Sequence, residues 1–97
     1  MEKEHLIKES TVICRNEKRF LVNKLGDELV MLNLETGEFI AMNTVGSDIW
    51  ILTENPVSVK ELLVQLKGMY DISDEICERE TFEFLNKSVS QQLFVAL

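Results

Sequence analysis

Two cysteines and one histidine are the side chains of this 97-residue chain best suited to act as nucleophile and base. Nucleophilic catalysis needs a cysteine or serine beside a base that a third group orients. Cys14 and Cys77 are far apart in the sequence, and the one histidine, His5, lies in a charged N-terminal stretch. A catalytic Cys–His pair is therefore not expected. We interpret both thiols as free and at least half-buried.

Carboxylates are the only abundant potential metal ligands. A metal site needs three or four ligands at suitable spacing, and acidic residues along one helix usually form a solvated face. That is our interpretation of Asp74, Glu75, Glu78, Glu80 and Glu83. The sequence also has no glycine-rich phosphate loop. We expect no metal, no cofactor and no enzymatic activity of the chain alone.

The net charge of −7, from 17 acidic and 10 basic residues, argues against nucleic acid as a partner because phosphate backbones repel an acidic protein. The longest apolar run, residues 49–52, is too short to span a membrane, and the N-terminus lacks the apolar segment of a signal peptide. We expect a cytoplasmic protein with no membrane partner. Residues 1–9 are predicted to be a flexible tail and residues 10–97 a single domain.

The first half of the chain reads as strands. Residues 11–14 and 19–22 are short β-rich runs, which leaves open whether they form one main strand or two. Residues 28–34 are almost wholly apolar, as in a strand covered on one face and partly on the other. The turn Glu35-Thr36-Gly37 then leads into a partner strand at 38–42, with Gly37 suited to a left-handed position.

The second half reads as helices. Asn43 or Thr44 caps the first, Ser58 forms a capping box with Glu61 in the second, and the third starts near Ser73. Trp50 on the first helix is predicted to be a core residue. The apolar residues 93–97 must pack on the domain or meet a partner, since they would otherwise invite aggregation.

Three strands followed by three helices indicate an α+β domain with helices on one face of a small sheet. The predicted architecture is winged-helix-like: a three-stranded antiparallel sheet followed by three helices.

The surface offers a binding function. If strand 38–42 lies at the sheet edge, its unpaired amides and carbonyls can accept an extended peptide as an added strand. The third helix carries two adjacent apolar stripes that could wall such a groove, although spacing alone allows both to be core. One stripe holds Cys77, Thr81, Phe84 and Ser88, and the other holds Glu78, Phe82, Leu85 and Val89.

Residues 28–43, the segment Val45-Gly46-Ser47-Asp48-Ile49-Trp50 and residues 59–63 together resemble the PqqD-like family, and most of all the standalone leader-binding proteins of lasso-peptide clusters. The resemblance covers roughly residues 27–90. Ser88 and Gln92 depart from it, at places where the family usually has Leu and Gly, and residues 10–25 match poorly.

The resemblance implies a non-catalytic protein. Such proteins bind the leader of a ribosomally synthesised precursor peptide as an extra antiparallel strand, in a groove walled by the third helix, and present it to a modifying enzyme or leader peptidase. The implied peptide-binding residues are Glu38, Phe39, Ile40, Ala41, Met42, Glu78, Phe82, Leu85 and Val89.

Two other functions stay open. A winged-helix DNA-binding domain shares the outline but needs a basic recognition helix, whereas the predicted second helix has only Lys60 and Lys67 and the third is acidic. An adaptor that recruits an enzyme without binding any leader is the other alternative.

Overall fold

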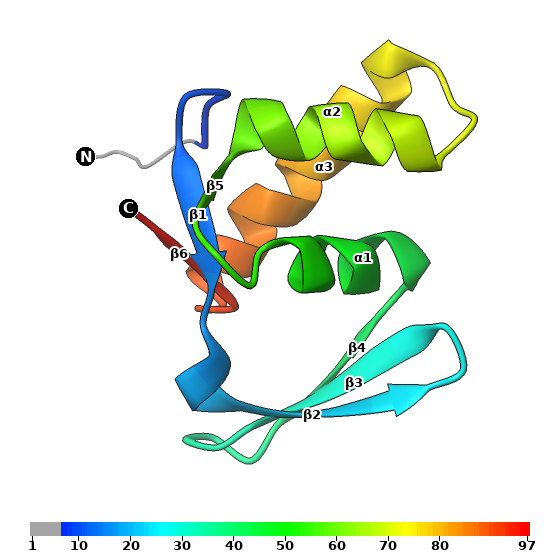
Figure 1. Cartoon of the computed structure of the whole chain (residues 1–97). Coiled ribbons are helices and arrows are strands. Elements are labelled where there is room, and N and C mark those ends of the chain that lie inside the picture. The colour runs from blue at the N-terminus through cyan, green and yellow to red at the C-terminus, as the bar shows by residue number, and fades with distance from the viewer. Residues whose placement is uncertain (1–6) are drawn as a thin grey trace.

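The computed structural model describes residues 7–97 (Figure 1). Along the chain the elements are β1 (Val12–Arg15), a 3-10 turn η1 (Glu17–Arg19), β2 (Phe20–Leu25), β3 (Glu28–Asn33), β4 (Phe39–Met42), α1 (Thr44–Leu52), β5 (Val57–Ser58), α2 (Val59–Met69), α3 (Asp74–Ser90) and β6 (Phe94–Ala96). The α+β class with antiparallel strands and three helices is confirmed.

The central sheet has the order β2-β3-β4, which leaves β4 at one edge and β2 at the other. The predicted hairpin is confirmed, with Leu29 opposite Met42 and Leu32 opposite Phe39. Gly37 has a φ of 79°, a backbone conformation that glycine adopts at no steric cost. The hairpin therefore fixes β4 as the last strand of this sheet.

A second sheet, with the order β5-β1-β6, was not predicted. The sequence predicted a single three-stranded sheet, and that prediction missed this second one. Residues 10–25 form two strands in different sheets, separated by η1, and β1 pairs with the C-terminal strand through Ile13 and Ala96. The apolar C-terminus thus packs back on the domain, where Leu93 and Phe94 are buried.

Side-chain caps fix where the three helices begin. Asn43 caps α1, and Ser58 and Ser73 cap α2 and α3, each accepting a backbone N–H of the first turn. Each cap satisfies one of the donors that a helix start leaves unpaired. The predicted starts of the second and third helices are confirmed, and of the two candidates for the first cap the structure has Asn43.

Aromatic side chains join the two sheets to the helices. Trp50 on α1 is 4% exposed and makes edge-on contacts with Phe20 and Phe94, at centroid distances of 6.2 and 5.8 Å. Phe94 in turn meets Phe84 of α3 at 6.0 Å. The prediction that Trp50 is a core residue is confirmed.

The predicted tail, residues 1–9, falls mostly outside the described residues, as does His5. Within the described part, Ile7 is buried and its N–H donates to Asn86 Oδ1 at 2.9 Å. Ile7, which the sequence placed in the predicted tail, therefore packs against the domain. Among residues 7–97, no helix combines the length and apolar character needed to cross a membrane.

Candidate functional site

The outer edge of β4 presents unpaired backbone groups. The carbonyl of Glu38 accepts the N–H of Asn33 at 2.8 Å, so the peptide group of residue 38 points into the sheet. Inward and outward directions alternate along an antiparallel strand. Ile40 therefore bonds toward β3, whereas the N–H and C=O groups of Phe39 and Ala41 point away from the sheet. These two residues form a free edge for pairing.

Ser47 of α1 holds the end of the hairpin in place. Its Oγ accepts the N–H of Leu29 at 2.9 Å and donates to the carbonyl of Met42 at 3.3 Å. Leu29 and Met42 are opposite each other in the register, so the hydroxyl bridges the last β3–β4 pair. The side chain is 2% exposed, and it ties the strand edge to the first helix.

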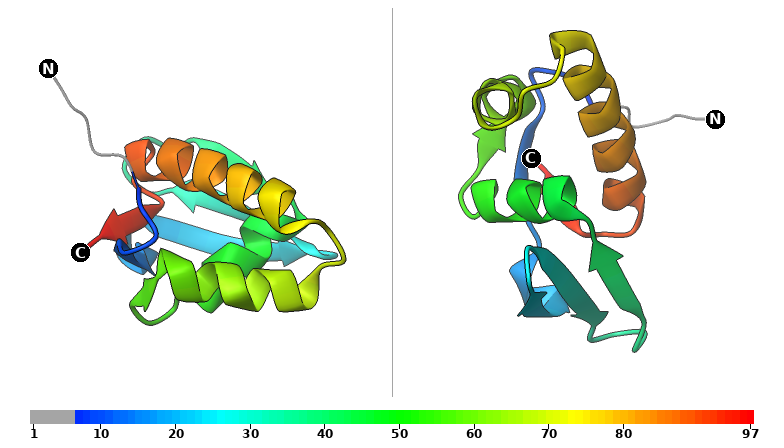
Figure 2. Two further views of the ribbon diagram at one scale, coloured as in Figure 1. Left: turned by 90° about the horizontal axis from the view of Figure 1, so that it is seen from above. Right: turned by 90° about the vertical axis from the view of Figure 1, so that its right-hand side faces the viewer.

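The C-terminal half of α3 lies beside β4 (Figure 2). Side chains of the two elements line a groove between them. We call this the β4–α3 groove. It consists of two neighbouring hollows of about 230 and 240 Å³ that share Ile40 and Gln91. The helix and the segment after it contribute Phe84, Lys87, Ser88, Gln91 and Leu93, and the hairpin contributes Asn33, Glu38, Phe39, Ile40, Ala41, Met42 and Asn43.

Gly46 allows α3 to come this close. A Cβ atom on Gly46 would lie 3.0 Å from Cε1 of Phe84 and 3.3 Å from the capping Oδ1 of Asn43. Both distances are tighter than ordinary van der Waals contact, so a larger residue would push the Phe84 ring. Glycine at this position of α1 thus leaves room for the Phe84 ring that lines the groove.

All five predicted strand residues, Glu38, Phe39, Ile40, Ala41 and Met42, line the β4–α3 groove. The four predicted helix residues lie elsewhere. Leu85 is fully buried, and Phe82 and Val89 pack against the core. The structure therefore brings only the strand half of the predicted set to the groove.

Glu78, the fourth helix residue, faces α2 instead of the groove. Its Oε2 accepts a hydrogen bond from Nζ of Lys67 at 2.7 Å. This bond, with a smaller contribution from the charge of Asp74, raises the pKa of Lys67. The stripe that contains Glu78 thus helps to join α3 to α2.

The groove wall belongs to the other stripe of α3. Phe84 and Ser88, which the sequence places on that stripe, line the groove together with Lys87 and Gln91. Lys87 and Gln91 lie three and seven residues after Phe84, which is the spacing of one helix face. An aromatic residue followed by polar residues at this spacing is the signal that sequence reasoning missed.

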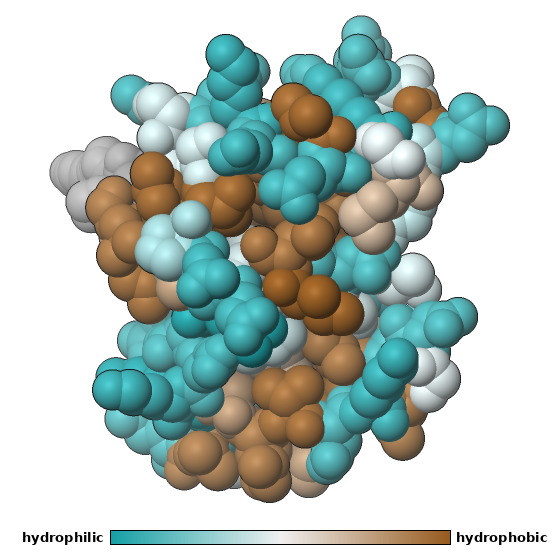
Figure 3. Space-filling view, in the orientation of Figure 1, coloured by the Kyte–Doolittle hydropathy of each residue, from teal (hydrophilic) through white to brown (hydrophobic). Residues whose placement is uncertain are grey.

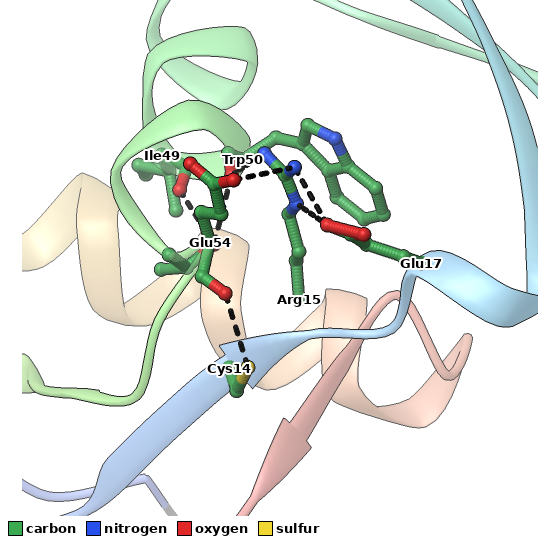
Figure 4. Close-up of polar contacts among 7 residues, drawn as sticks. Cys14, Arg15, Glu17, Ile49, Trp50 and Glu54 are labelled. Carbon is green, nitrogen blue, oxygen red and sulfur yellow. Dashed lines mark hydrogen bonds and ion pairs between the residues drawn. The ribbon is translucent and has the colours of Figure 1, made fainter.

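A further concavity, of about 410 Å³, lies beside β2 and is lined in part by Phe20, Val22 and Trp50. Its charged groups are already engaged within the domain (Figure 4). The guanidinium of Arg15 lies 5.5 Å from the Trp50 ring centroid and 2.6 Å from the carboxylate of Glu17, and it donates to the carbonyl of Trp50. These contacts join β1 and η1 to α1.

The remaining candidate groups do not assemble into a reactive centre within the described residues. Cys14 is half-buried and Cys77 is buried, and both are free thiols. Among residues 7–97, no three His, Cys, Asp or Glu side chains come together as a metal site. What this part of the chain offers is a strand edge beside an apolar and polar groove.

Comparison with protein families matches residues 28–93 to the family described as Coenzyme PQQ synthesis protein D (PqqD). The matched segment contains the hairpin, the three helices and the whole β4–α3 groove. The chain belongs to the PqqD family. A search of the curated proteins gives no significant match.

One solved structure of another protein has a fold similar to that of this PqqD-family chain. It is described as TbiB1 in complex with the TbiA(beta) leader peptide. The two are 26% identical, with a TM-score of 0.73, over 84% of this chain and 93% of the other. The share of this chain that is aligned is larger than the segment matched to the family.

Proposed function

We propose that this PqqD-family chain binds the leader segment of a ribosomally synthesised precursor peptide as a strand added to β4. The observation that carries the proposal is the free edge at Phe39 and Ala41, which lies directly beside the β4–α3 groove. Strand addition obtains affinity from backbone hydrogen bonds and selectivity from side-chain pockets. The leader-bound TbiB1 structure supports the same kind of ligand.

The register assigns the two faces of the bound peptide. In an antiparallel pair, directly opposite residues point to the same face of the sheet. Leader side chains opposite Ile40 and Met42 therefore enter the groove against Phe84 and Ser88. Those opposite Phe39 and Ala41 stand on the other face. The ligand is thus an extended segment with apolar or small residues at alternate positions.

The domain supplies binding and a second protein supplies the chemistry. That partner is a modifying enzyme or leader peptidase, to which the domain presents the peptide. Because such a precursor is made by the ribosome, we place the complex in the cytoplasm.

The decisive experiment is a proline scan of the two sheet edges. Proline has no N–H and is tolerated on edge strands where the N–H faces outward. Ala41→Pro removes an outward donor from β4, and Ala41→Thr is the matched control that keeps it. Lys24→Pro makes the same change on β2. The carbonyl of Arg19 accepts the N–H of Leu34, so residue 19 points into the sheet. Because directions alternate along the strand, the N–H of Lys24 points outward.

The ligands are fluorescently labelled leader segments of the precursor peptides encoded beside this gene, titrated by polarisation. We expect Ala41→Pro to weaken binding by about tenfold or more, a loss of about 1.4 kcal/mol, while Ala41→Thr and Lys24→Pro bind as the wild type does. Circular dichroism checks that each variant is folded. If Lys24→Pro and not Ala41→Pro loses the peptide, the leader pairs with β2 and the proposed site is wrong.

A further inference from the structure

The α3 wall of the β4–α3 groove contains a buried hydroxyl group that has no partner within the described part of the domain. The side chain of Ser88 is 1% exposed and lines the hollow of about 230 Å³. A serine in a helix commonly bonds back to a carbonyl of the preceding turn. Ser90 does so, with its Oγ 2.6 Å from the carbonyl oxygen of Lys87. Among residues 7–97, Ser88 Oγ forms no hydrogen bond.

An unpaired buried hydroxyl is unusual, because nearly all buried polar groups in native proteins have a partner. The buried polar side chains of residues 7–97 are Ser47, Thr53, Thr81 and Ser88. Ser47 bridges β3 and β4, and Thr53 Oγ1 donates to the carbonyl of Ile49 at 2.8 Å. Two of the four hydroxyls are thus bonded within the domain, and the other two need a different explanation.

The space beside each unpaired hydroxyl distinguishes Ser88 from Thr81. Thr81 adjoins a hollow of about 20 Å³, which has room for one water molecule and no more. The hollow of Ser88 is about 230 Å³ and is also lined by the edge strand β4. Only Ser88 therefore has room beside it for the side chain of a bound peptide.

The register of strand addition identifies which leader residue reaches Ser88. Met42 lines the hollow of Ser88 and not the neighbouring hollow, whereas Ile40 lines both. A leader residue directly opposite Met42 points to the same face of the sheet as Met42 does. Its side chain therefore enters the hollow that contains the Ser88 hydroxyl.

We propose that Ser88 selects leaders with a small, uncharged, hydrogen-bonding side chain, Ser, Thr or Asn, at the position opposite Met42. This selectivity rests on the proposed leader binding. A serine hydroxyl both donates and accepts, so another hydroxyl or an amide satisfies it. An apolar side chain would cover the hydroxyl and leave it without water or partner, which costs the full desolvation penalty.

A charged leader residue fits this position less well. At the depth of Ser88 a carboxylate or ammonium group would lose its hydration and gain one neutral hydroxyl in return. Lys87 is the charged residue that lines this hollow, and its side chain is exposed to solvent. It can pair with an acidic group at the rim without drawing that group down to Ser88.

The same hydroxyl has opposite effects on the free and the bound domain. In the free domain it is buried without a partner and lowers stability, whereas in the complex it forms a hydrogen bond. Ser88→Ala should therefore leave the free domain at least as stable as the wild type while it weakens binding of the selected leader. A hydroxyl that served only the structure would show the reverse on stability.

The experiment compares leader peptides that differ by one pair of side chains of the same shape, Thr and Val. Each position of the segment that pairs with β4 carries Thr in one labelled peptide and Val in the next, and a third peptide carries Asp there. The proteins are the full-length wild type, Ser88→Ala and the matched control Thr81→Val, which also removes a buried unpaired hydroxyl from α3. Polarisation gives the affinities, and urea denaturation gives the stability of each protein.

We expect the wild type to prefer Thr over Val by about fivefold or more at one position whose side chain enters the groove. Ser88→Ala should reduce this preference to about twofold or less, with an unchanged or higher urea midpoint, and Thr81→Val should keep it. An equal preference in Ser88→Ala, a clear loss of its stability, or a Ser88-dependent preference for Asp overturns the proposed selectivity and leaves leader binding intact. Failure of the wild type to bind any of the leaders refutes the proposed function itself.

Discussion

Ser47 shows how one buried hydroxyl can position the edge strand of a sheet. It satisfies the N–H of Leu29 and the carbonyl of Met42 at the point where the sheet meets α1. Among residues 7–97, no other side chain forms a hydrogen bond with either group. The geometry of β4 next to the groove thus depends on this residue more than its size suggests.

Substitution of Ser47 by Ala leaves a buried donor and a buried acceptor without their partner. We expect Ser47→Ala to lower the free energy of unfolding by about 1–3 kcal/mol, measured by urea denaturation. Ser90 is a suitable control, because its Oγ bonds only to the exposed carbonyl of Lys87 within the same helix. If Ser90→Ala costs as much as Ser47→Ala, the bridge has no special weight.

Trp50 is the residue on which the two sheets converge. Its ring contacts Phe20 of the central sheet and Phe94 of the second sheet. Trp50→Ala should cost about 3–5 kcal/mol through lost contacts and the cavity left behind. That is a large part of the stability of so small a domain, about 5–15 kcal/mol. Ile51→Ala, at a neighbouring position that is 54% exposed, should be nearly neutral, and equal melting temperatures for the two variants would contradict this account.

At the scale of elements, the parts set by local sequence were predictable. The β3–β4 hairpin has its signal in the Thr-Gly turn and the flanking apolar residues, and α2 and α3 begin at Ser58 and Ser73 as their caps predict. The strand half of the groove follows from the hairpin, because in a three-stranded meander the last strand lies at an edge.

Contacts between distant segments were not predictable in the same way. β6 pairs with β1, although most of the chain lies between them in the sequence. No residue pattern near Phe94 predicts that β6 lies beside Ile13. The rotation of α3 has the same origin. Two contacts accompany the orientation of α3 toward β4. Lys67 donates a hydrogen bond to Glu78 on the stripe that faces α2, and Gly46 leaves room for the ring of Phe84 on the other stripe. Periodicity alone identifies both stripes and cannot rank them.

The contact between α1 and α2 should respond to pH. The hydroxyl of Tyr70, at the end of α2, donates to Asp48 Oδ2 of α1. Burial, together with this bond and the charge of Asp48, raises the pKa of Tyr70 from 10.0 to about 12. The folded state therefore holds the phenol proton more tightly than the unfolded state, and the resulting stability is complete below pH 10.0 and is lost as pH rises toward about 12.

Tyr70→Phe tests this linkage. Between pH 10 and 12 the wild type should lose more unfolding free energy than the variant, because the variant lacks the titrating group. Lysines also titrate in this range and are common to both proteins, so the difference between the two urea-denaturation series isolates Tyr70. Parallel pH profiles would mean that the hydroxyl makes no such bond in solution.

At the scale of the whole molecule, the two faces of the central sheet differ in what covers them (Figure 1). Helices cover the inner face of the central sheet, and its outer face carries the exposed apolar side chains Leu21, Leu25 and Phe39 beside the polar Asn23 and Glu28. Apolar atoms gather along the lower border of the molecule, where these strands lie (Figure 3). The edge between them adjoins the β4–α3 groove. The net charge of −7 opposes self-association through the exposed leucines, because copies with the same charge repel one another, and it also disfavours nucleic acid.

The same distribution predicts how leader binding depends on salt. One hollow of the groove contains a cation, Lys87, and the other contains an anion, Glu38. The groups of β4 that would pair with the leader are neutral backbone N–H and C=O groups. Charges exposed to solvent are largely screened at high ionic strength, but backbone bonds and apolar contacts are not. We expect the dissociation constant of the leader to change by less than about threefold between roughly 0.05 and 0.5 M NaCl, where a phosphate-binding site would lose orders of magnitude.

The salt titration also separates the groove from any charged surface. Lys87→Gln should reduce the remaining salt dependence and weaken an acidic leader only modestly, because a single exposed ion pair contributes about 0–1 kcal/mol. Lys60→Gln, on the exposed side of α2, is the matched control and should leave the titration unchanged. A steep salt dependence that Lys87→Gln does not alter would place the leader on charged residues outside the β4–α3 groove, and strand addition to β4 would no longer account for the affinity.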